Sequence, residues 1–186
     1  MSSRRVPLQN WVLFWTIALS GMTFDLFTKS AIFAMVGPPG SPAVPLVGSI
    51  LELRTSHNRG ALWGFGTGLA HSSAIFAALS IVAALVICYW LFVRGAATDW
   101  RLTIALGLVM AGALGNCHDR IFFGHVRDFV HFHVDSIGFD CAIFNFADNM
   151  LVIGACLLML LALRPDPPAD EANRVQAPGA EPSSAS

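Results

Sequence analysis

The chain has 186 residues, of which 55% are hydrophobic and only 12% are charged, and its formal net charge is −1. A soluble domain usually has about twice that charged fraction, so the composition argues against an ordinary soluble protein. A nearly neutral chain without a basic stripe also argues against a nucleic-acid partner. The apolar residues are grouped in runs, and a helix that crosses a membrane needs about 20 of them.

Four apolar windows of about this length follow one another along the chain. They are residues 11–35, 69–93, 102–118 and 142–163. Asp25 and Lys29 lie within the first window. Asp119 and Arg120 end the third, and Asp148 lies within the fourth. The windows take up about half of the chain and leave too little sequence for a separate soluble domain. We therefore expect an all-α membrane protein with four transmembrane helices.

The first window has features of a secretory signal. Arg4 and Arg5 precede it, and the Ala-Leu-Ser sequence at residues 18–20 is similar to a cleavage site. The apolar stretch continues well beyond this point, however, so we expect an uncleaved first helix. Residues 19–22 also resemble the site at which bacterial lipoproteins are modified, but Met22 stands where the lipidated Cys is required.

Four spans place both termini on one side of the membrane, and the loop cations indicate which side this is. The cations on the side of the termini are Arg4, Arg5, Arg94, Arg101, Arg164 and Arg174. We therefore expect both termini to be cytoplasmic. The opposite face then has the two long connections, residues 36–68 and 121–141. Residues 50–54 and 125–130 within them have a strand-like pattern, which predicts a small β element on the outer (periplasmic) face.

The C-terminal segment differs in composition from the rest of the chain. Residues 165–186 are rich in Ala, Pro and Ser and cannot bury a hydrophobic core. We expect a disordered cytoplasmic tail here, after a single membrane domain that covers residues 1–164.

Charged residues inside the windows are candidates for function, because a charge at the centre of a membrane helix costs about 2.5–3.5 kcal/mol. Asp25 and Lys29 are one helical turn apart, so we expect them to neutralise each other. Asp119 is adjacent to Arg120, and we expect that cation to keep it ionised. Asn145 shares a helix face with Asp148.

Asp128 and Asp148 have no obvious cation one turn away. Arg127 is adjacent to Asp128, but in a strand it would point to the opposite side. Two carboxylates that meet in a site of low dielectric share one proton, and aspartic peptidases use such a pair. The spacing alone leaves a second reading open, in which Asp128 is a solvated loop acid and Asp148 is a helix-packing residue.

Two other residue types have less specific patterns. The cysteines have no C-x-x-C spacing and lie mostly inside the windows, so we expect them to pack as small apolar residues; they are Cys88, Cys117, Cys141 and Cys156. His131 and His133 could suggest a metal, but alternate strand residues share a side in ordinary sheets too. We expect these histidines to be solvated, and we expect no metal and no other cofactor.

Two alternative functions would use polar or cysteine residues of the windows. A small transporter or proton-conducting protein could use Asp25, Lys29 and Asp148 as a relay within the membrane. The inner halves of the second, third and fourth windows are almost without ionisable groups, which argues against a path through the membrane. A quinone-linked disulfide enzyme would need paired outer cysteines, for which only Cys117 and Cys141 are candidates.

Four segments together carry a resemblance to a known family. Residues 25–29 match D-x-x-x-K, and residues 58–64 match N-x-G-x-x-[FW]-G. Residues 112–129 match G-N-x-x-D-R…G-x-V-x-D-F, and residues 144–148 match F-N-x-A-D. In these segments, and over about residues 10–163, the chain resembles the lipoprotein signal peptidases, or signal peptidase II, of aspartic peptidase family A8.

The resemblance implies a catalytic dyad formed by Asp128 and Asp148. It also implies a set of residues that position the substrate or support the dyad: Asp25, Lys29, Asn58, Gly60, Asn116, Asp119, Arg120 and Asn145. The implied reaction removes the signal peptide from diacylglyceryl-modified prolipoproteins, N-terminal to the lipidated Cys, with water and without a cofactor. The implied protein is a monomer in the bacterial cytoplasmic (inner) membrane, in contact with lipid, with its active site at the outer leaflet.

Overall fold

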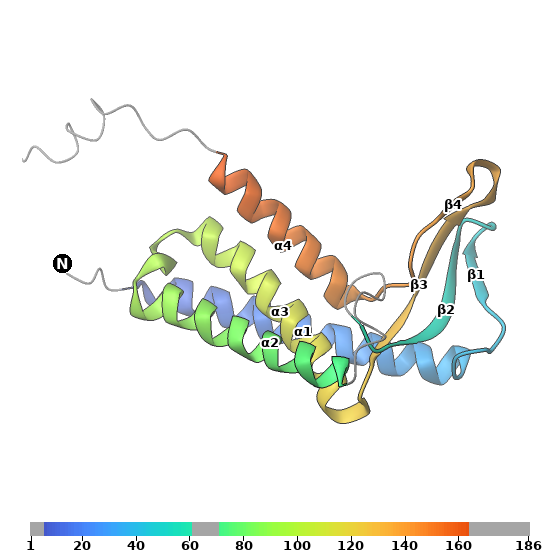
Figure 1. The fold of residues 1–186 in the computed structure, drawn as a ribbon. Helices are drawn as coiled ribbons and strands as arrows, with labels where there is room; N and C mark the ends of the chain where they lie inside the picture. The colour runs from blue at the N-terminus through green and yellow to red at the C-terminus, as the bar shows by residue number, and fades with distance from the viewer. Residues whose placement is uncertain (1–5, 61–70, 164–186) are drawn as a thin grey trace, which may run out of the picture.

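The computed structural model describes residues 6–60 and 71–163. Several features considered above lie outside these ranges: Arg4, Arg5, residues 61–64 of the second matched segment, Arg164, Arg174 and the expected tail of residues 165–186. Most of the helical structure lies in one part of the molecule and the strands form the other part, but the C-terminal end of the first helix extends alongside the strands (Figure 1). Both ends of the described chain lie at the end of the helical part that is far from the strands (Figure 1).

The main helices are α1 (Leu8–Val36), α2 (Ser72–Cys88), α3 (Trp100–Phe123) and α4 (Phe146–Ala162). A π-helical turn, η2 (Tyr89–Val93), continues α2, and the 3-10 turn η3 (Ala96–Thr98) precedes α3. Within the described residues, α1, α2 with η2, and α3 are long and apolar enough to cross a membrane. The fourth expected span corresponds to α4, which is a shorter apolar helix of 17 residues.

The helix that contains the third apolar window extends beyond that window, because α3 continues to Phe123. Asp119 and Arg120 therefore lie inside the helix. The helix ends at Gly124, whose φ of 73° is in the left-handed region that glycine adopts without a Cβ clash. An apolar window stops at the first charge, whereas the hydrogen-bonded helix continues to the residue that can reverse its direction.

The central helix is α3, which packs against α1, α2 and α4. Most of α3 is buried, whereas much of α1 and α2 is exposed. Their exposed residues include large apolar side chains such as Phe27 and Leu85. Apolar surface of this extent on a bundle is typical of helices that contact lipid.

Small residues on α3 allow α4 and α1 to approach closely. A Cβ at Gly112 would collide with the carbonyl oxygen of Ala147 on α4. A Cβ at Gly115 would lie 2.5 Å from the Oδ2 atom of Asp25. These glycines therefore make the space in which the start of α4 and an acid of α1 meet.

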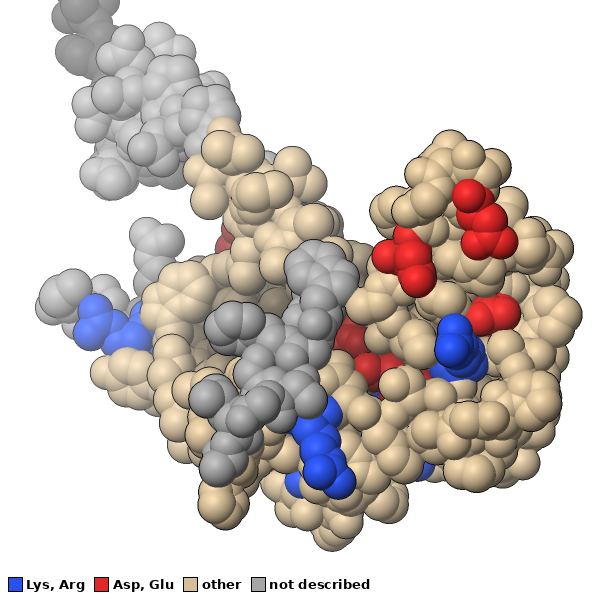
Figure 2. Space-filling model, turned by 45° about the vertical axis from the view of Figure 1, so that its right-hand side comes forward, with Lys and Arg blue, Asp and Glu red and all other residues tan. Residues whose placement is uncertain are grey.

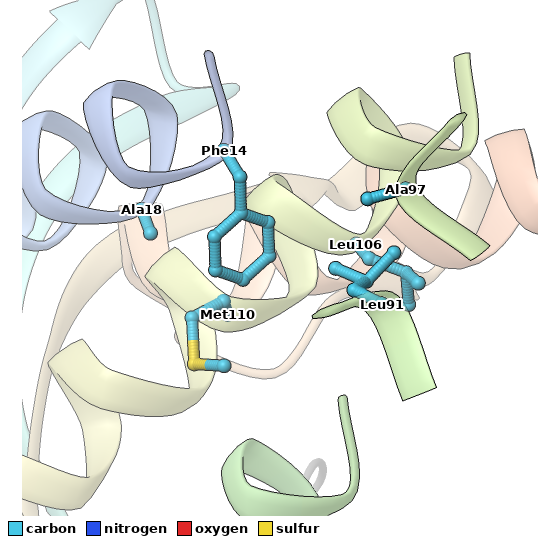
Figure 3. Packing of buried hydrophobic residues seen from close by; sticks show 6 residues of the cluster. All are labelled: Phe14, Ala18, Leu91, Ala97, Leu106 and Met110. Atoms are coloured by element: carbon cyan, nitrogen blue, oxygen red, sulfur yellow. The ribbon is translucent and has the colours of Figure 1, made fainter. Parts of the chain in front are cut away.

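A hydrophobic core lies at the end of the helical part that is far from the strands. Its buried members among the described residues are Phe14, Ala18, Leu91, Ala97, Leu106 and Met110. The Phe14 ring points from α1 toward Met110 of α3, and Leu91 lies beside Leu106 (Figure 3). Trp11 also stacks on Phe92, with 3.6 Å between ring centroids. Apolar packing thus fixes this end of the molecule.

The strands form an antiparallel sheet with the order β1-β2-β3-β4. Their bounds are β1 (Val44–Val47), β2 (Leu51–Asn58), β3 (Val126–Val134) and β4 (Phe139–Asp140), with the 3-10 turn η4 (Asp135–Ile137) between β3 and β4. The two strands predicted at residues 50–54 and 125–130 are confirmed, and each is longer than predicted. The register pairs Glu52 with His131 and Asn58 with Val126, with an irregularity between Leu53 and Ser56.

Candidate active site

Two acids that the sequence leaves without an obvious cation meet where the helices adjoin the sheet. Asp128 lies in β3 and is almost fully buried, and Asp148 lies in the first turn of α4. The reading of Asp128 as a solvated loop acid is therefore wrong. The chain turns at Gly124 after α3 and enters β3, which pairs with β2. This pairing places residue 128 where the sheet adjoins the helices.

Asn145 connects the two acids. Its side-chain Nδ2 donates to Oδ1 of Asp128 at 2.6 Å. Its backbone N–H donates to Oδ2 of Asp148 at 3.2 Å, and its Oδ1 accepts from the backbone N–H of Asp148 at 3.0 Å. The last two bonds form a capping box at the start of α4, a role for which Asn at the N-cap and an acid three residues later are well suited. The local fold of the helix start therefore also fixes the geometry of the acid pair.

Asn116 of α3 extends this network. Its Nδ2 donates to Oδ1 of Asp148 at 2.8 Å. Its Oδ1 accepts from Nζ of Lys29 at 2.9 Å and from Nδ2 of Asn145 at 3.2 Å. A buried amide that uses both ends in this way is held in one orientation. Asn116 therefore holds one oxygen of Asp148 in place.

The predicted pair of Asp25 and Lys29 is confirmed. Nζ of Lys29 lies 2.7 Å from Oδ2 of Asp25, and both side chains are fully buried. Oδ1 of Asp25 accepts from the backbone N–H of Ala147 at 2.9 Å. The acid thus interacts with an unpaired N–H group at the N-terminus of α4, where the helix dipole favours negative charge.

The predicted pairing of Asp119 with Arg120 is wrong. Arg127 binds Asp119 instead, with Nη2 2.9 Å from Oδ1 and the backbone N–H 3.0 Å from Oδ2. Lys29 lies 3.5 Å from the same acid. Adjacent residues on a helix point in different directions, whereas β3 brings Arg127 back against the end of α3. Arg127 was not predicted as a site residue, although it stands in the matched G-x-V-x-D-F segment.

Arg120 lies close to the acid pair. Its Nη2 donates to the carbonyl oxygen of Gly60 at 3.0 Å, and its guanidinium lies over the Phe76 ring, 5.5 Å from the centroid. It also interacts electrostatically with both Asp148 and Asp128. Arg120 is thus a cation held beside two carboxylates without forming an ion pair with either.

The end of β2 completes the site. The side chain of Asn58 hydrogen-bonds to Asp128. Its Oδ1 also accepts from the backbone N–H of Gly60 at 2.9 Å, which closes a tight turn. All ten residues predicted for the site therefore lie in one connected set of contacts, although they come from five separate segments.

The electrostatics of Asp128 are unusual for an acid. Burial raises its pKa to about 7, and the nearby carboxylate of Asp148 contributes in the same direction. Hydrogen bonds from Asn145 and Asn58 act against this rise but do not cancel it. Asp128 can therefore hold a proton near neutral pH, and the site can supply one acid and one base at the same time.

A groove leads away from the acid pair between α2, α3 and α4. Its volume is about 340 Å³. The polar end has Asn116, Arg120 and Asp148, and the walls are formed by apolar residues such as Leu79, Val109 and Leu151. Figure 2 shows acidic side chains recessed between the sheet part and the helical part. The groove can hold an apolar segment of which one end reaches Asp148.

His131 differs from its prediction as a solvated residue. It is buried, with Nδ1 2.8 Å from Oε1 of Glu52 and Nε2 2.7 Å from Oδ1 of Asp140. Burial alone would lower the pKa of His131, but these two hydrogen bonds raise it overall. The strand register explains the error, because Glu52 lies directly opposite His131.

The cysteines are all free. Cys117 is buried, and its Sγ lies 3.6 Å from the carbonyl oxygen of Ala77. Its packing agrees with the prediction of a small apolar residue. Cys117 and Cys141, the candidates for a redox pair, form no disulfide.

The comparisons with known proteins agree on one group. A family model described as "Signal peptidase (SPase) II" matches residues 17–164. A "Lipoprotein signal peptidase" of Rhodopirellula baltica is 35% identical over 166 residues, which cover 83% of this chain and 73% of that protein. One of Burkholderia vietnamiensis is 38% identical over 149 residues, covering 80% of this chain and 86% of that protein.

Solved structures give the same result for the fold. A structure described as a bacterial membrane enzyme has a TM-score of 0.71 and 29% sequence identity, and the match covers 94% of this chain and 96% of that one. A second such structure has a TM-score of 0.69 at 29% identity, covering 89% of this chain and 99% of the other.

Proposed function

The chain belongs to the signal peptidase II family, and from this premise we propose that it is an aspartic endopeptidase that uses Asp128 and Asp148 as its catalytic dyad. Its substrates are diacylglyceryl-modified prolipoproteins, which it cuts N-terminal to the lipidated Cys. The observation that carries the proposal is the pair of acids held by Asn145 at the end of an apolar groove. A signal peptide is an apolar segment of the kind that such a groove can hold.

The mechanism follows from one proton shared by two carboxylates. The ionised carboxylate takes a proton from a water molecule, and the resulting hydroxide attacks the scissile carbonyl carbon. The protonated carboxyl donates a hydrogen bond to the carbonyl oxygen, which becomes negative as the tetrahedral intermediate forms. A proton then passes to the amine of the departing Cys as the C–N bond breaks. The acids titrate as a unit, so each step belongs to the pair.

The remaining residues of the site position the pair or the substrate in this proposal. Asn116 and Asn145 orient the carboxylates. Asp25 and Lys29 fix the start of α4, and Asp119 holds β3 through Arg127. Arg120, Asn58 and Gly60 lie beside the dyad, where their polar groups can bind the substrate backbone. Buried networks of this kind rigidify a site when each member has its partners.

The topology proposed for the enzyme has four spans, with α4 as the fourth. Both ends of the described chain lie away from the sheet (Figure 1), which supports cytoplasmic termini and a sheet on the outer (periplasmic) face. The dyad then lies at the outer leaflet of the cytoplasmic (inner) membrane. A diacylglyceryl group can remain in that leaflet while the scissile bond reaches the carboxylates. Residues 1–164 form the membrane domain, and residues 165–186 form a cytoplasmic tail.

The enzyme needs no second copy in this proposal, because one chain supplies both acids and their partners, and membrane lipid surrounds it. A transporter would need ionisable groups along the helices. In the part of the chain that the structure describes, the end far from the sheet instead has the apolar core around Phe14 and Met110. No observation favours the transporter over the peptidase.

Comparison of matched precursors tests the substrate class. Purified enzyme in detergent is incubated with one prolipoprotein in three forms: diacylglyceryl-modified, unmodified, and with the modified Cys replaced by Ser. A gel shift of the lipidated form alone is the expected result. Equal cleavage of the unmodified form would contradict the proposed requirement for lipid.

A further inference from the structure

The sheet has a second cluster of ionisable side chains, separate from the acid pair. It consists of Glu52 of β2, His131 and His133 of β3, and Asp140 of β4. The register pairs Glu52 with His131 and His133 with Asp140. His131 and His133 are alternate residues of one strand and so share a side of the sheet. Three adjacent strands therefore bring two imidazoles and two carboxylates together.

The distances within the cluster are those of potential metal ligands. Nδ1 of His131 lies 2.8 Å from Oε1 of Glu52, and Nε2 of the same ring lies 2.7 Å from Oδ1 of Asp140. One ligand atom from each of Glu52, His131 and His133 lies within 4.8 Å of the others. The two imidazole rings stack with 4.8 Å between centroids.

The cluster also contains a potential metal-ligand atom that has no hydrogen-bond partner among the described residues. Nδ1 of His133 is buried and has no hydrogen-bond partner among the described residues. Buried polar atoms in native proteins nearly always have a partner, so an exception of this kind calls for an explanation. A ring nitrogen without a proton is a good metal ligand.

The charge around the cluster favours a cation. A cavity of about 420 Å³ adjoins it, lined by Glu52, Asp135, Asp140, both histidines and Arg54. Three carboxylates face one guanidinium and the two imidazoles, so the carboxylates remain in excess when His131 is protonated. Figure 2 shows these signs on the sheet part, where acidic side chains gather around a basic one. The net charge of the cavity wall is therefore negative.

We propose that this cluster is a binding site for Zn²⁺, with Glu52, His131 and His133 as ligands. Two imidazoles with a carboxylate form a ligand set typical of Zn²⁺, whereas Mg²⁺ and Ca²⁺ prefer oxygen ligands alone. Asp140 accepts a hydrogen bond from the second ring nitrogen of His131. A carboxylate in this position fixes the tautomer and orientation of a metal-binding histidine in many zinc sites.

Binding requires only small movements of side chains. Ligand atoms of one tetrahedral Zn²⁺ lie about 3.3 Å apart, given metal–ligand distances of about 2.0–2.2 Å. The pair of Glu52 and His131 is slightly closer than this, and His133 is further away. Rotation about side-chain torsions of Glu52 and His133 can adjust both separations. Water or the nearby Asp135 can supply the fourth ligand.

The metal would stabilise β3, the strand that contains Asp128 of the proposed dyad. His131 lies three residues after Asp128 in β3 and, because strand residues alternate, on the opposite side of that strand. Cross-linking β2 to β3 by the metal stabilises the sheet without placing the ion among the reacting groups. The site is thus structural, and it is independent of the proposed dyad.

Titration of the metal-free full-length protein in detergent with Zn²⁺ tests the site. Calorimetry gives the affinity, and the melting temperature is measured with and without the metal. Co²⁺ serves as a second probe, because tetrahedral Co²⁺ absorbs visible light strongly. The variants are His133→Ala and Glu52→Gln, of which the second keeps the shape of the side chain and removes its charge. His71→Asn is the matched control, since it removes an exposed histidine elsewhere.

One Zn²⁺ per chain should bind the wild-type protein at micromolar concentration, raise its melting temperature, and give a tetrahedral Co²⁺ spectrum. Each variant should bind at least about 10-fold more weakly, the smallest loss usual for a disturbed zinc site. His71→Asn should bind as the wild type does. Absence of saturable binding, or binding that His133→Ala and Glu52→Gln leave unchanged, would overturn the proposal, and the cluster would then be an ion-pair network only.

Discussion

The side-chain amide of Asn145 donates a hydrogen bond of 2.6 Å to Oδ1 of Asp128. The same residue caps α4, where its Oδ1 accepts a hydrogen bond from the backbone N–H of Asp148 at 3.0 Å. One side chain thus joins the strand that carries the first acid to the helix that carries the second. The relative position of the two carboxylates therefore depends directly on Asn145.

Replacement of Asn145 by Ala should therefore reduce both stability and turnover. Loss of an N-cap costs about 0.5–2 kcal/mol, and loss of the bond to Asp128 should lower kcat by at least about 10-fold, since small misplacements of reacting groups are costly. Asp99→Ala is a matched control, because Asp99 caps α3 and has no contact with the acids among the described residues. It should lose comparable stability and keep its kcat. Equal kcat values for the two variants would refute the role of Asn145.

The pH dependence of the reaction should reflect the raised pKa of Asp128, which is about 7. Above this pH Asp128 loses its proton, and its carboxyl can no longer donate a hydrogen bond to the scissile carbonyl. We expect kcat/KM for a lipidated precursor to fall about tenfold per pH unit above about pH 7. The melting temperature, measured over the same range, separates this effect from unfolding. A rate that stays constant to about pH 9 would exclude a dyad that needs its proton.

Asp128→Asn should make the protein more stable. The pKa of Asp128 rises from 3.8 to about 7 on folding, so the folded state binds more protons than the unfolded chain between these values. The free energy of unfolding of the wild type therefore falls as the pH rises through that window. The variant does not show this fall in the free energy of unfolding. In the wild type the fall is on the order of 4 kcal/mol at most, given about 1.4 kcal/mol per pKa unit.

The melting temperatures of both proteins, compared at about pH 5 and about pH 8, check this sign. The advantage of Asp128→Asn should be larger at the higher pH. A variant that is less stable than the wild type by the same amount at both pH values would show that burial does not raise the pKa of Asp128.

Lys29→Met should destabilise the protein strongly. Lys29 is the buried cation for Asp25 at 2.7 Å and for Asp119 at 3.5 Å. Breaking a buried ion pair by removing one partner costs about 3–5 kcal/mol, because it leaves an uncompensated charge. Thr23→Val changes an exposed residue of the same helix, whose hydroxyl bonds only to the carbonyl oxygen of Leu19 in the described structure. A melting temperature of Lys29→Met that matched the control would argue against this role.

Residue spacing in the sequence predicted the contacts between site residues that are close together in the chain. The spacing of Asp25 and Lys29 along one helix face determines their contact, and the contact is present. Alternation of apolar and polar residues located β2 and β3, though not their full lengths. Asn145 and Asp148 also have the spacing of a capping box, a signal in the sequence that predicts their mutual hydrogen bonds.

Partners that depend on packing between distant segments could not be found in this way. Arg127 reaches Asp119 because β3 folds back over the end of α3, and no spacing rule describes that return. The burial of His131 depends on the register of β2 and β3, which includes an irregularity. The pairing of Asp128 with Asp148 was predicted from family resemblance, since the spacing of the two acids alone allowed other readings.

The central claim is that Asp128 and Asp148 carry out the hydrolysis together. Processing of a diacylglyceryl prolipoprotein in vitro by Asp128→Asn and Asp148→Asn tests it most directly. Asp99→Asn is the control, because Asn caps a helix as well as Asp does, and melting curves establish that each variant is folded.

Each of the two dyad variants should lose at least about 100-fold in rate, the lower end of what a positioned acid or base contributes, while Asp99→Asn processes the precursor at the wild-type rate. A folded Asp128→Asn or Asp148→Asn protein that retains the wild-type rate would contradict the claim.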